Sequence, residues 1–500
     1  MSNVNHNIRF VYHLVKSLSK PELRLLKLHL GGSRSKQDTT STDGDIKSGK
    51  TLFASFIDKI VAYKGDDDIQ QIEDYLSKFY NTNQRRNVSS RILKRIDDFL
   101  LMELTIVKGV NKDRVVQQFL LRRIVILDVL LSKGLFDHFR FISQKLILLA
   151  DRYEKYLEAM TIIRMQMAFL VNRINQREYN NLVEAHNLRF HKYQEVFKCN
   201  NYAIQLQQMY NERFKFQNIK EFLNPIIERL NEHEIDSDTW RIGRNLILLE
   251  YYQQNEDFEN GDLVCQNTIS IYNRNKYISN PTRIGNAYRQ FANNQMLGGK
   301  YKLSIFSIEK ILNVYPKGSI NWISCYEHIF LAYFYLNQFD MAFSTLKLLN
   351  SASQKSINLS MRSRLDFYNG VLEFKFREYN NALSKFYNAG NLYEDKGGWG
   401  FCIRLYTLLA YIEMNDLDSA AISYDSFRKY FDKYNKLNEI PERFVLIFSI
   451  IRRIVKSDFN ILRASSDLAS LVSELNYSGM KWQPKSPELV KFDDWLKKIF

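Results

Sequence analysis

The sequence predicts an all-α protein, most of it a long stack of antiparallel helix pairs. Glycine and proline are scarce, at 19 and 7 of 500 residues, and this composition favours long helices joined by short turns. In the second half of the chain a small residue recurs at intervals of 43, 38, 40 and 38 residues. An aromatic residue or a leucine stands three positions before each small residue. Repeats of this kind are typical of arrays that grow by adding one helix pair at a time.

The beginning of the chain differs from the rest, and residues 1–110 are expected to form a small helical domain. Ser19, Pro21 and Glu22 make a capping box with a proline in the first turn, which predicts a helix up to about residue 30. Residues 31–50 contain almost no apolar side chains and are expected to be a mobile loop. Apolar residues at helical spacing predict the remaining helices at 8–18, 51–63, 69–79 and 88–107.

The clearest repeat unit is the segment 299–316, GKYKLSIFSIEKILNVYP. Gly299 and Tyr301 are expected in the turn, and Ser304 at the small position of the second helix. Counting back 12 residues from Ser304 reaches Ala292, which is expected to face it from the first helix. Two helices approach closely where small side chains meet, and aromatic residues then fill the gap to the next pair. The pattern resembles the tetratricopeptide repeat (TPR), which implies a right-handed α-α superhelix, a TPR-like solenoid.

Four further segments follow the same frame, with small positions at Gly261, Ala342, Ala382 and Ala420. Weaker matches extend the expected solenoid over residues 117–480. The tail, residues 481–500, is expected to form a capping helix that covers the last apolar face, with Trp495 as its anchor.

The first helices of the chain carry a second resemblance. The segments LVKSLSKPELRLLKLHL and TLFASFIDKI resemble the start of a group of bacterial cytoplasmic proteins, in which a similar helical segment precedes TPR-like repeats. This resemblance implies no particular activity.

Composition narrows the possible partners and compartments. The chain has 70 basic and 55 acidic residues, a net charge of +15, which permits an acidic partner but also fits ordinary charge-based solubility. The four cysteines are far apart and form no CxxC pair, as expected in a reducing cytoplasm. The polar start of the sequence and the lack of a long apolar run predict neither a signal peptide nor membrane insertion.

One segment matches a nucleotide-binding motif. Residues 44–51, GDIKSGKT, fit the loop whose backbone amides and lysine surround phosphates at a helix start. That loop normally follows a buried strand, yet residues 37–43 are QDTTSTD, and no alternation of strands and helices surrounds them. We therefore expect an ordinary loop and no cofactor.

Metal-binding and catalytic patterns are also missing from the sequence. His186 and His191 are five positions apart, so a helix would point them in different directions. Neither a GxSxG motif nor a Cys-His arrangement is recognisable. An open helical array offers a broad groove in place of a dry pocket, which argues against catalysis. We therefore expect a protein that is not an enzyme.

Basic residues gather around the start of one predicted N-terminal helix. Such a cluster could hold a nucleic-acid backbone, although Asp97 and Asp98 partly offset it. A nucleic-acid-binding or transcription-regulatory protein therefore stays open as the alternative function, less favoured than protein binding. The candidate contacts are Arg85, Arg86, Arg91, Lys94 and Arg95.

The first helices of the repeats are expected to line a concave groove. The carboxylate clamp of chaperone-binding TPR domains uses Lys and Asn in one repeat, Asn in the next, and Lys and Arg in a third. The matching positions here hold Arg289 and Asn293, then His328, then Arg364 and Tyr368, so Asn293 is the one identical residue. The sequence therefore predicts a non-catalytic scaffold that binds a protein or peptide in this groove. The candidate groove residues are Arg289, Asn293, Glu327, His328, Phe334, Arg364 and Phe374.

Overall fold

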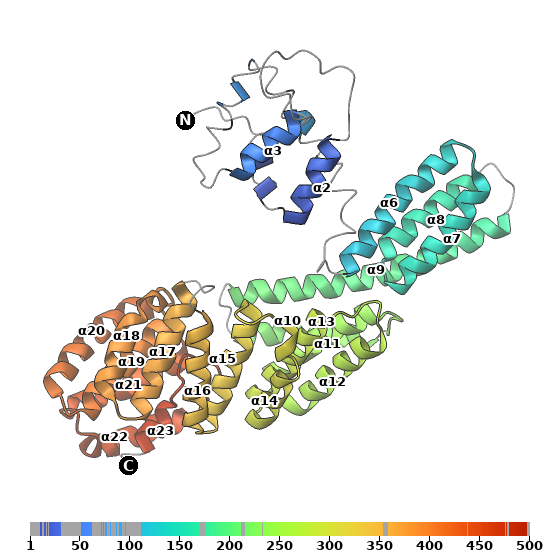
Figure 1. The fold of residues 1–500 in the computed structure, drawn as a ribbon. Helices are drawn as coiled ribbons and strands as arrows, with labels where there is room; N and C mark the ends of the chain where they lie inside the picture. The colour runs from blue at the N-terminus through green and yellow to red at the C-terminus, as the bar shows by residue number, and fades with distance from the viewer. Residues whose placement is uncertain are drawn as a thin grey trace. The chain divides into compact units, whose positions relative to one another are not determined.

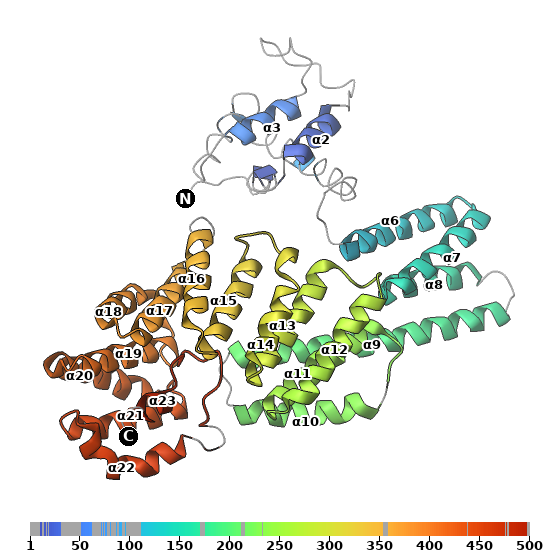
Figure 2. The same cartoon turned by 60° about the horizontal axis from the view of Figure 1, so that its bottom comes forward.

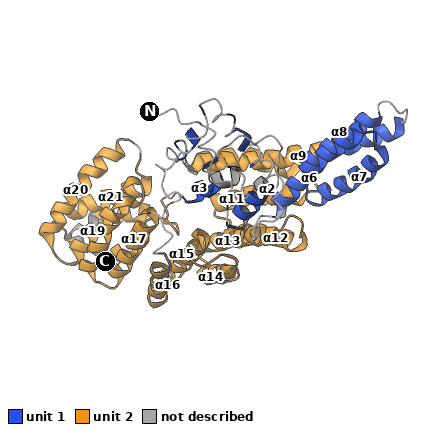
Figure 3. Cartoon of the chain, turned by 45° about the horizontal axis from the view of Figure 1, so that its top comes forward, with its two compact units in different colours: residues 1–186 blue, residues 187–500 orange. Residues whose placement is uncertain are grey.

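The computed structural model contains helices and no β-strand in the residues that it describes, which confirms the all-α class (Figure 1). These residues are 112–170, 176–211, 216–232, 234–353, 359–437, 439–475, 477 and 480–497. Before residue 112, two helices and a few single positions are described. The chain divides into two compact units, Met1–His186 and Asn187–Phe500 (Figure 3). The expected domain limits near 110, 117 and 480 stay a prediction.

The first unit has two hydrophobic clusters. Helices α2 (Lys20–Gly31) and α3 (Leu52–Ala62) pack on each other, and Leu26, Ile57 and Ile60 are fully buried in one cluster. The helices α6 (Lys112–Ser132), α7 (Phe136–Arg152) and α8 (Tyr156–Leu170) form the second cluster, around Phe139 and Ala159. The expected loop at 31–50 lies outside the described residues, apart from Gly31, which ends α2.

Helix α9 (Gln176–Asn211) crosses the limit between the two units, and α10 (Phe216–Glu232) follows it in the second unit. From there the second unit is a run of antiparallel helix pairs in chain order, in which each helix packs on the next (Figure 2). The pairs are α11 (Asp238–Gln254) with α12 (Phe258–Arg274), α13 (Pro281–Leu297) with α14 (Tyr301–Glu309), α15 (Ile320–Tyr335) with α16 (Phe339–Ser353), α17 (Leu359–Lys375) with α18 (Tyr379–Asn388), α19 (Trp399–Glu413) with α20 (Leu417–Asn435), and α21 (Glu442–Lys456) with α22 (Ile461–Glu474).

A regular turn geometry confirms the repeat frame. Each of the first five pairs turns through one residue of positive φ, and five positions after that residue stands the predicted small residue. The five small residues are all buried, so the close approach expected of a TPR-like solenoid is present. The turn residues are Glu256, Gly299, Asn337, Arg377 and Asn415.

Two contacts show how tightly the helices pack at these positions. The Ser304 hydroxyl donates a 2.8 Å hydrogen bond to the carbonyl of Ala292, the residue expected to face it. In the α17–α18 pair, a Cβ added to Gly370 would lie 2.6 Å from the ring of Phe386, so a glycine is required there. Large aromatic residues then fill the space between pairs, with Phe330, Phe367 and Phe386 almost fully buried.

The tail differs from its expected form. Instead of one helix over 481–500, the short helix α23 covers Phe492–Lys497, and residues 480–491 form a non-helical strap (Figure 2). Pro484 and Pro487 explain this, because proline lacks the amide donor that a helix interior needs. Trp495 is nevertheless an anchor: it is 3% exposed and its indole donates to Glu413 at 2.7 Å.

Candidate functional site

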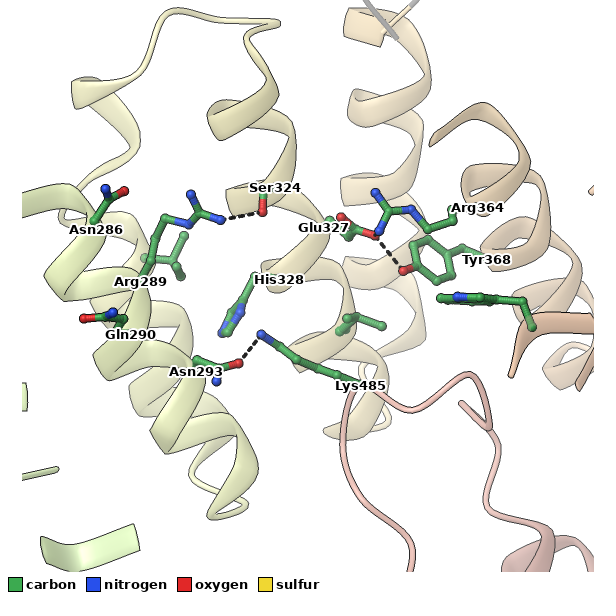
Figure 4. A pocket seen from close by; sticks show the side chains of 13 residues that line it. Asn286, Arg289, Gln290, Asn293, Ser324, Glu327, His328, Arg364, Tyr368 and Lys485 are labelled. Carbon is green, nitrogen blue, oxygen red and sulfur yellow. Dashed lines mark hydrogen bonds and ion pairs between the residues drawn. The ribbon is translucent and has the colours of Figure 1, made fainter. Parts of the chain in front are cut away.

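The candidate site is a pocket of about 500 Å³ on the face formed by the first helices of three successive pairs. We refer to it as the α13–α17 pocket (Figure 4). Helices α13, α15 and α17 supply most of its wall, and Lys485 of the strap completes it. Its polar and charged lining residues are Asn286, Arg289, Gln290, Asn293, Ser324, Glu327, His328, Arg364, Tyr368 and Lys485.

Helical spacing explains why these side chains converge. On α13 the lining residues stand at Asn286 and three, four and seven positions later, and on α15 the same spacing starts at Ser324. Positions so spaced share one helix face. The two helices α13 and α15 therefore each present one lining face, polar throughout on α13 and polar except for Leu331 on α15, and α17 adds Arg364 and Tyr368, four positions apart.

The carboxylate of Glu327 is already satisfied inside the pocket. It accepts a 2.7 Å hydrogen bond from the Tyr368 hydroxyl, and Arg364 lies 3.4 Å from the same oxygen. Burial, followed by the nearby Glu327 charge, raises the pKa of Tyr368 far above its usual range, so this hydroxyl remains a donor. Glu327 and Arg364 thus offset each other.

His328 is a buried, neutral member of the pocket wall. Its Nε2 is hydrogen-bonded to the hydroxyl of Ser304, the small residue of the preceding pair. Burial, followed by the charges of Lys485 and Arg289, lowers its pKa well below the usual value. Its role is to join α15 to α14, and it is not a source of positive charge at neutral pH.

Two cations in the pocket have no anionic partner. Arg289 donates to the side chains of Asn321 at 3.2 Å and Ser324 at 3.0 Å, both neutral. The Lys485 ammonium donates to the side-chain oxygen of Asn293. Within the described part of the chain, no carboxylate lies within ion-pair distance of either cation. The pocket therefore holds uncompensated positive charge.

Five of the seven predicted groove residues line this pocket, namely Arg289, Asn293, Glu327, His328 and Arg364. Tyr368, at the last position compared with the clamp, lines it as well. Phe334 and Phe374 do not. They are 3% and 6% exposed, because each lies at the end of its helix and packs against an aromatic residue just after the turn. Phe339 contacts Phe334, and Tyr379 contacts Phe374.

Other predicted sites fall largely outside the described residues. Of the basic cluster, Arg91 is described, and it is exposed, whereas Arg85, Arg86, Lys94 and Arg95 are not. The whole motif 44–51 also lies outside. His186 and His191 both lie on α9, and the described residues contain no cluster of three side chains suited to a metal ion. No described helix has both the length and the apolar character needed to cross a membrane.

No protein-family model matches this chain, and no curated protein sequence matches it. Similar solved structures are helical repeat proteins of low identity. The apo form of RapI has 12% identity and a TM-score of 0.42, over 67% of this chain and 88% of that one. Aspartyl phosphate phosphatase F from Bacillus subtilis has 12% identity and a TM-score of 0.40, over 66% and 84%. BtubC from P. vanneervenii has 12% and 0.37, over 44% and 92%. These likenesses concern the TPR-like fold and say nothing of activity.

Proposed function

We propose that this protein is a non-catalytic scaffold that binds a segment of a partner protein in the α13–α17 pocket. One observation carries the proposal: polar side chains from three helices and the strap converge on one hollow in which two cations lack a counter-charge. If these cations only stabilised the fold, a carboxylate of the same chain would be expected next to each of them. A half-buried arginine and an exposed lysine that line one hollow are instead suited to recognising a partner.

The proposal favours binding over catalysis because of how the pocket groups are used. His328 is tied to Ser304 and neutral, and Glu327 is bound by Tyr368 and Arg364. Neither group is free to move a proton to or from a substrate. The four cysteines are buried, and burial raises the pKa of each, that of Cys199 to about 11, which disfavours the thiolate form that a cysteine nucleophile needs.

The test is site-specific photo-crosslinking in the native cell. A photoreactive amino acid replaces Asn286, an exposed residue at the rim of the pocket, and a second variant carries it at Lys429, on α20 outside the pocket. We expect a discrete crosslinked protein from position 286 that is absent from position 429 and is lost when Arg289→Glu is added. Crosslinks of equal pattern from both positions, or crosslinks to nucleic acid in place of protein, would refute the proposal.

A further inference from the structure

A tight turn in the middle of the strap aims Lys485 into the α13–α17 pocket. The amide of Ser486 donates to the carbonyl of Gln483, and Lys485 has a φ of 68°. With Pro484 before it, this is the arrangement of a type II turn, in which the third position favours glycine. A lysine there costs of the order of 1 kcal/mol of backbone strain. The strained residue is the one whose ammonium enters the pocket.

The strap is fixed at both ends, and Arg443 donates a hydrogen bond to the carbonyl of Met480 where the strap begins. At its base, Glu488 is fully buried and forms a bidentate ion pair with Arg443, at 2.7 and 2.8 Å. The Tyr406 hydroxyl donates a hydrogen bond to the carbonyl of Val490 and accepts one from its amide. This base positions the rest of the strap.

The tip, residues 481–486, lies between these two anchors, and the Trp482 indole donates to the carbonyl of Glu488 at 2.6 Å. Lys481 forms an exposed ion pair with Glu256, and such pairs contribute little. Trp482 packs edge-on against Tyr335, whose hydroxyl accepts a hydrogen bond from the Lys485 amide at 2.9 Å. The tip residues are exposed or half-buried, unlike Glu488 and Val490, so the tip can respond to what occupies the pocket while both anchors stay in place.

The charges of the pocket lining indicate the chemistry of the ligand that it would bind. Arg289 and Lys485 face the same space, and the pKa of Lys485 is lowered by desolvation in the pocket and by the Arg289 charge, against the opposing charge of Glu327. Glu327 offsets part of the repulsion between the two cations, but it is bound by Tyr368 and Arg364 and lies beyond ion-pair distance of both. A pair of carboxylates would relieve this repulsion and make charge-assisted hydrogen bonds with both cations.

We propose that the α13–α17 pocket is a two-part site for an acidic stretch of a partner protein, with Arg289 fixed on α13 and Lys485 delivered by the strap, and that occupation latches the strap. The inference rests on the proposed function and names the chemistry of the partner. Side-chain carboxylates on neighbouring residues bridge the two cations, so the ligand joins the strap tip to α13. Without the ligand, the single hydrogen bond between Lys485 and Asn293 joins the tip to α13.

The test uses the full-length protein and hexaglutamate, blocked at both ends and fluorescently labelled, with hexaglutamine as the uncharged control. Anisotropy titrations compare wild type with Arg289→Met, Lys485→Met and Lys485→Arg. Lys429→Met is the matched control, because it removes the same charge at a site outside the pocket. We expect Arg289→Met and Lys485→Met to weaken binding at least tenfold, with Lys485→Arg within threefold and Lys429→Met within twofold of wild type.

Hydrogen exchange of residues 480–491 supplies the second readout. Saturating hexaglutamate should slow exchange there at least threefold in wild type and leave it unchanged in Lys485→Met. Faster exchange on binding would overturn the latch, because the strap would then be displaced. A lack of saturable binding to wild type, or equal binding by Lys485→Met, would also overturn the inference. The proposed function would survive these outcomes if the crosslink from position 286 still depended on Arg289.

Discussion

The tight α17–α18 contact makes Gly370→Ala a strong test of the packing. The new Cβ would lie 2.6 and 2.7 Å from two ring carbons of Phe386, about 1 Å inside normal carbon contact. The ring has little room to move, because Phe386 is 1% exposed and packs on Phe367 and Tyr406 at centroid distances of 5.9 and 6.0 Å. Overpacking of this severity lowers the free energy of unfolding by about 3 kcal/mol, and the better helix propensity of alanine raises it by about 1 kcal/mol. The net loss is about 2 kcal/mol.

Denaturant unfolding, together with hydrogen exchange in α17 and α18, measures this loss. Gly390→Ala is the control, because its Cβ would meet nothing closer than the Tyr393 ring at 4.0 Å, so we expect no destabilisation. Adding Phe386→Leu to Gly370→Ala should cost less than the sum of the two single changes, since the smaller side chain vacates the contested space. If Gly370→Ala proves as stable as Gly390→Ala, the close approach of α17 and α18 is misplaced.

Three further predictions concern the strap and the buried groups. Glu488→Gln should destabilise the tail by about 2 kcal/mol and speed hydrogen exchange in α23, because Arg443 loses one of its two buried carboxylate partners and keeps Asp493; unchanged exchange would contradict this. All four cysteines are buried, and burial together with the Asp262 charge raises the pKa of Cys265 to about 12. A thiol reagent should therefore react with the unfolded protein at least 100-fold faster than with the folded protein. Rapid labelling of the folded protein would contradict this. Desolvation by the pocket wall lowers the pKa of Lys485 to about 8, with the Glu327 charge opposing this shift and the Arg289 charge adding to it. Binding of hexaglutamate should therefore weaken as pH rises through about 8. Titrations from pH 6.5 to 9.5 test this, and Lys485→Arg should flatten the profile.

The groups that face Lys485 support the sign of that pH effect. Arg289 comes from α13, Glu327 and neutral His328 from α15, and Arg364 from α17. A bound carboxylate favours the charged ammonium, so the complex takes up a proton near pH 8 and affinity falls as that proton is lost. The folded pKa lies below the unfolded one, so in the absence of ligand this group makes the fold more stable as pH rises from about 8 towards 10.5.

The repeat frame could be predicted because each of its signals is local. Small residues, turn aromatics and their spacing occur within one helix pair, and the same rule places Arg289 and Asn293 on one face of α13. The same reasoning misplaced Phe334, because the sequence does not tell a residue on the inner face from one that packs under the next turn. Contacts with Phe330 and Phe339, at centroid distances of 6.1 and 5.6 Å, decide its position.

The strap could not be predicted by such local rules. Lys485 is 192 residues from Asn293 in the chain, and no periodicity links the two. The prolines around Lys485 signal a break in the helix, but they do not say which face the segment follows. Its path is set by two buried ion pairs that Arg443 makes with Glu488 and Asp493, 45 and 50 residues away. In the sequence all three look like ordinary surface charges.

The backbone strain at Lys485 gives a way to test whether the strap tip serves the stability of the fold or the binding of a ligand. If the tip served stability, glycine would be the better residue at its turn. Relief of left-handed strain favours glycine by about 1–2 kcal/mol, and its greater unfolded-state entropy opposes this by about 0.5–1 kcal/mol. Lys485→Gly should therefore raise stability by about 0.5 kcal/mol in denaturant unfolding, while hexaglutamate binding falls as it does in Lys485→Met. Such a trade is typical of residues retained for binding. A loss of more than about 1 kcal/mol in Lys485→Gly would instead mean that the ammonium holds the tail in place, and the latch would lose its physical basis.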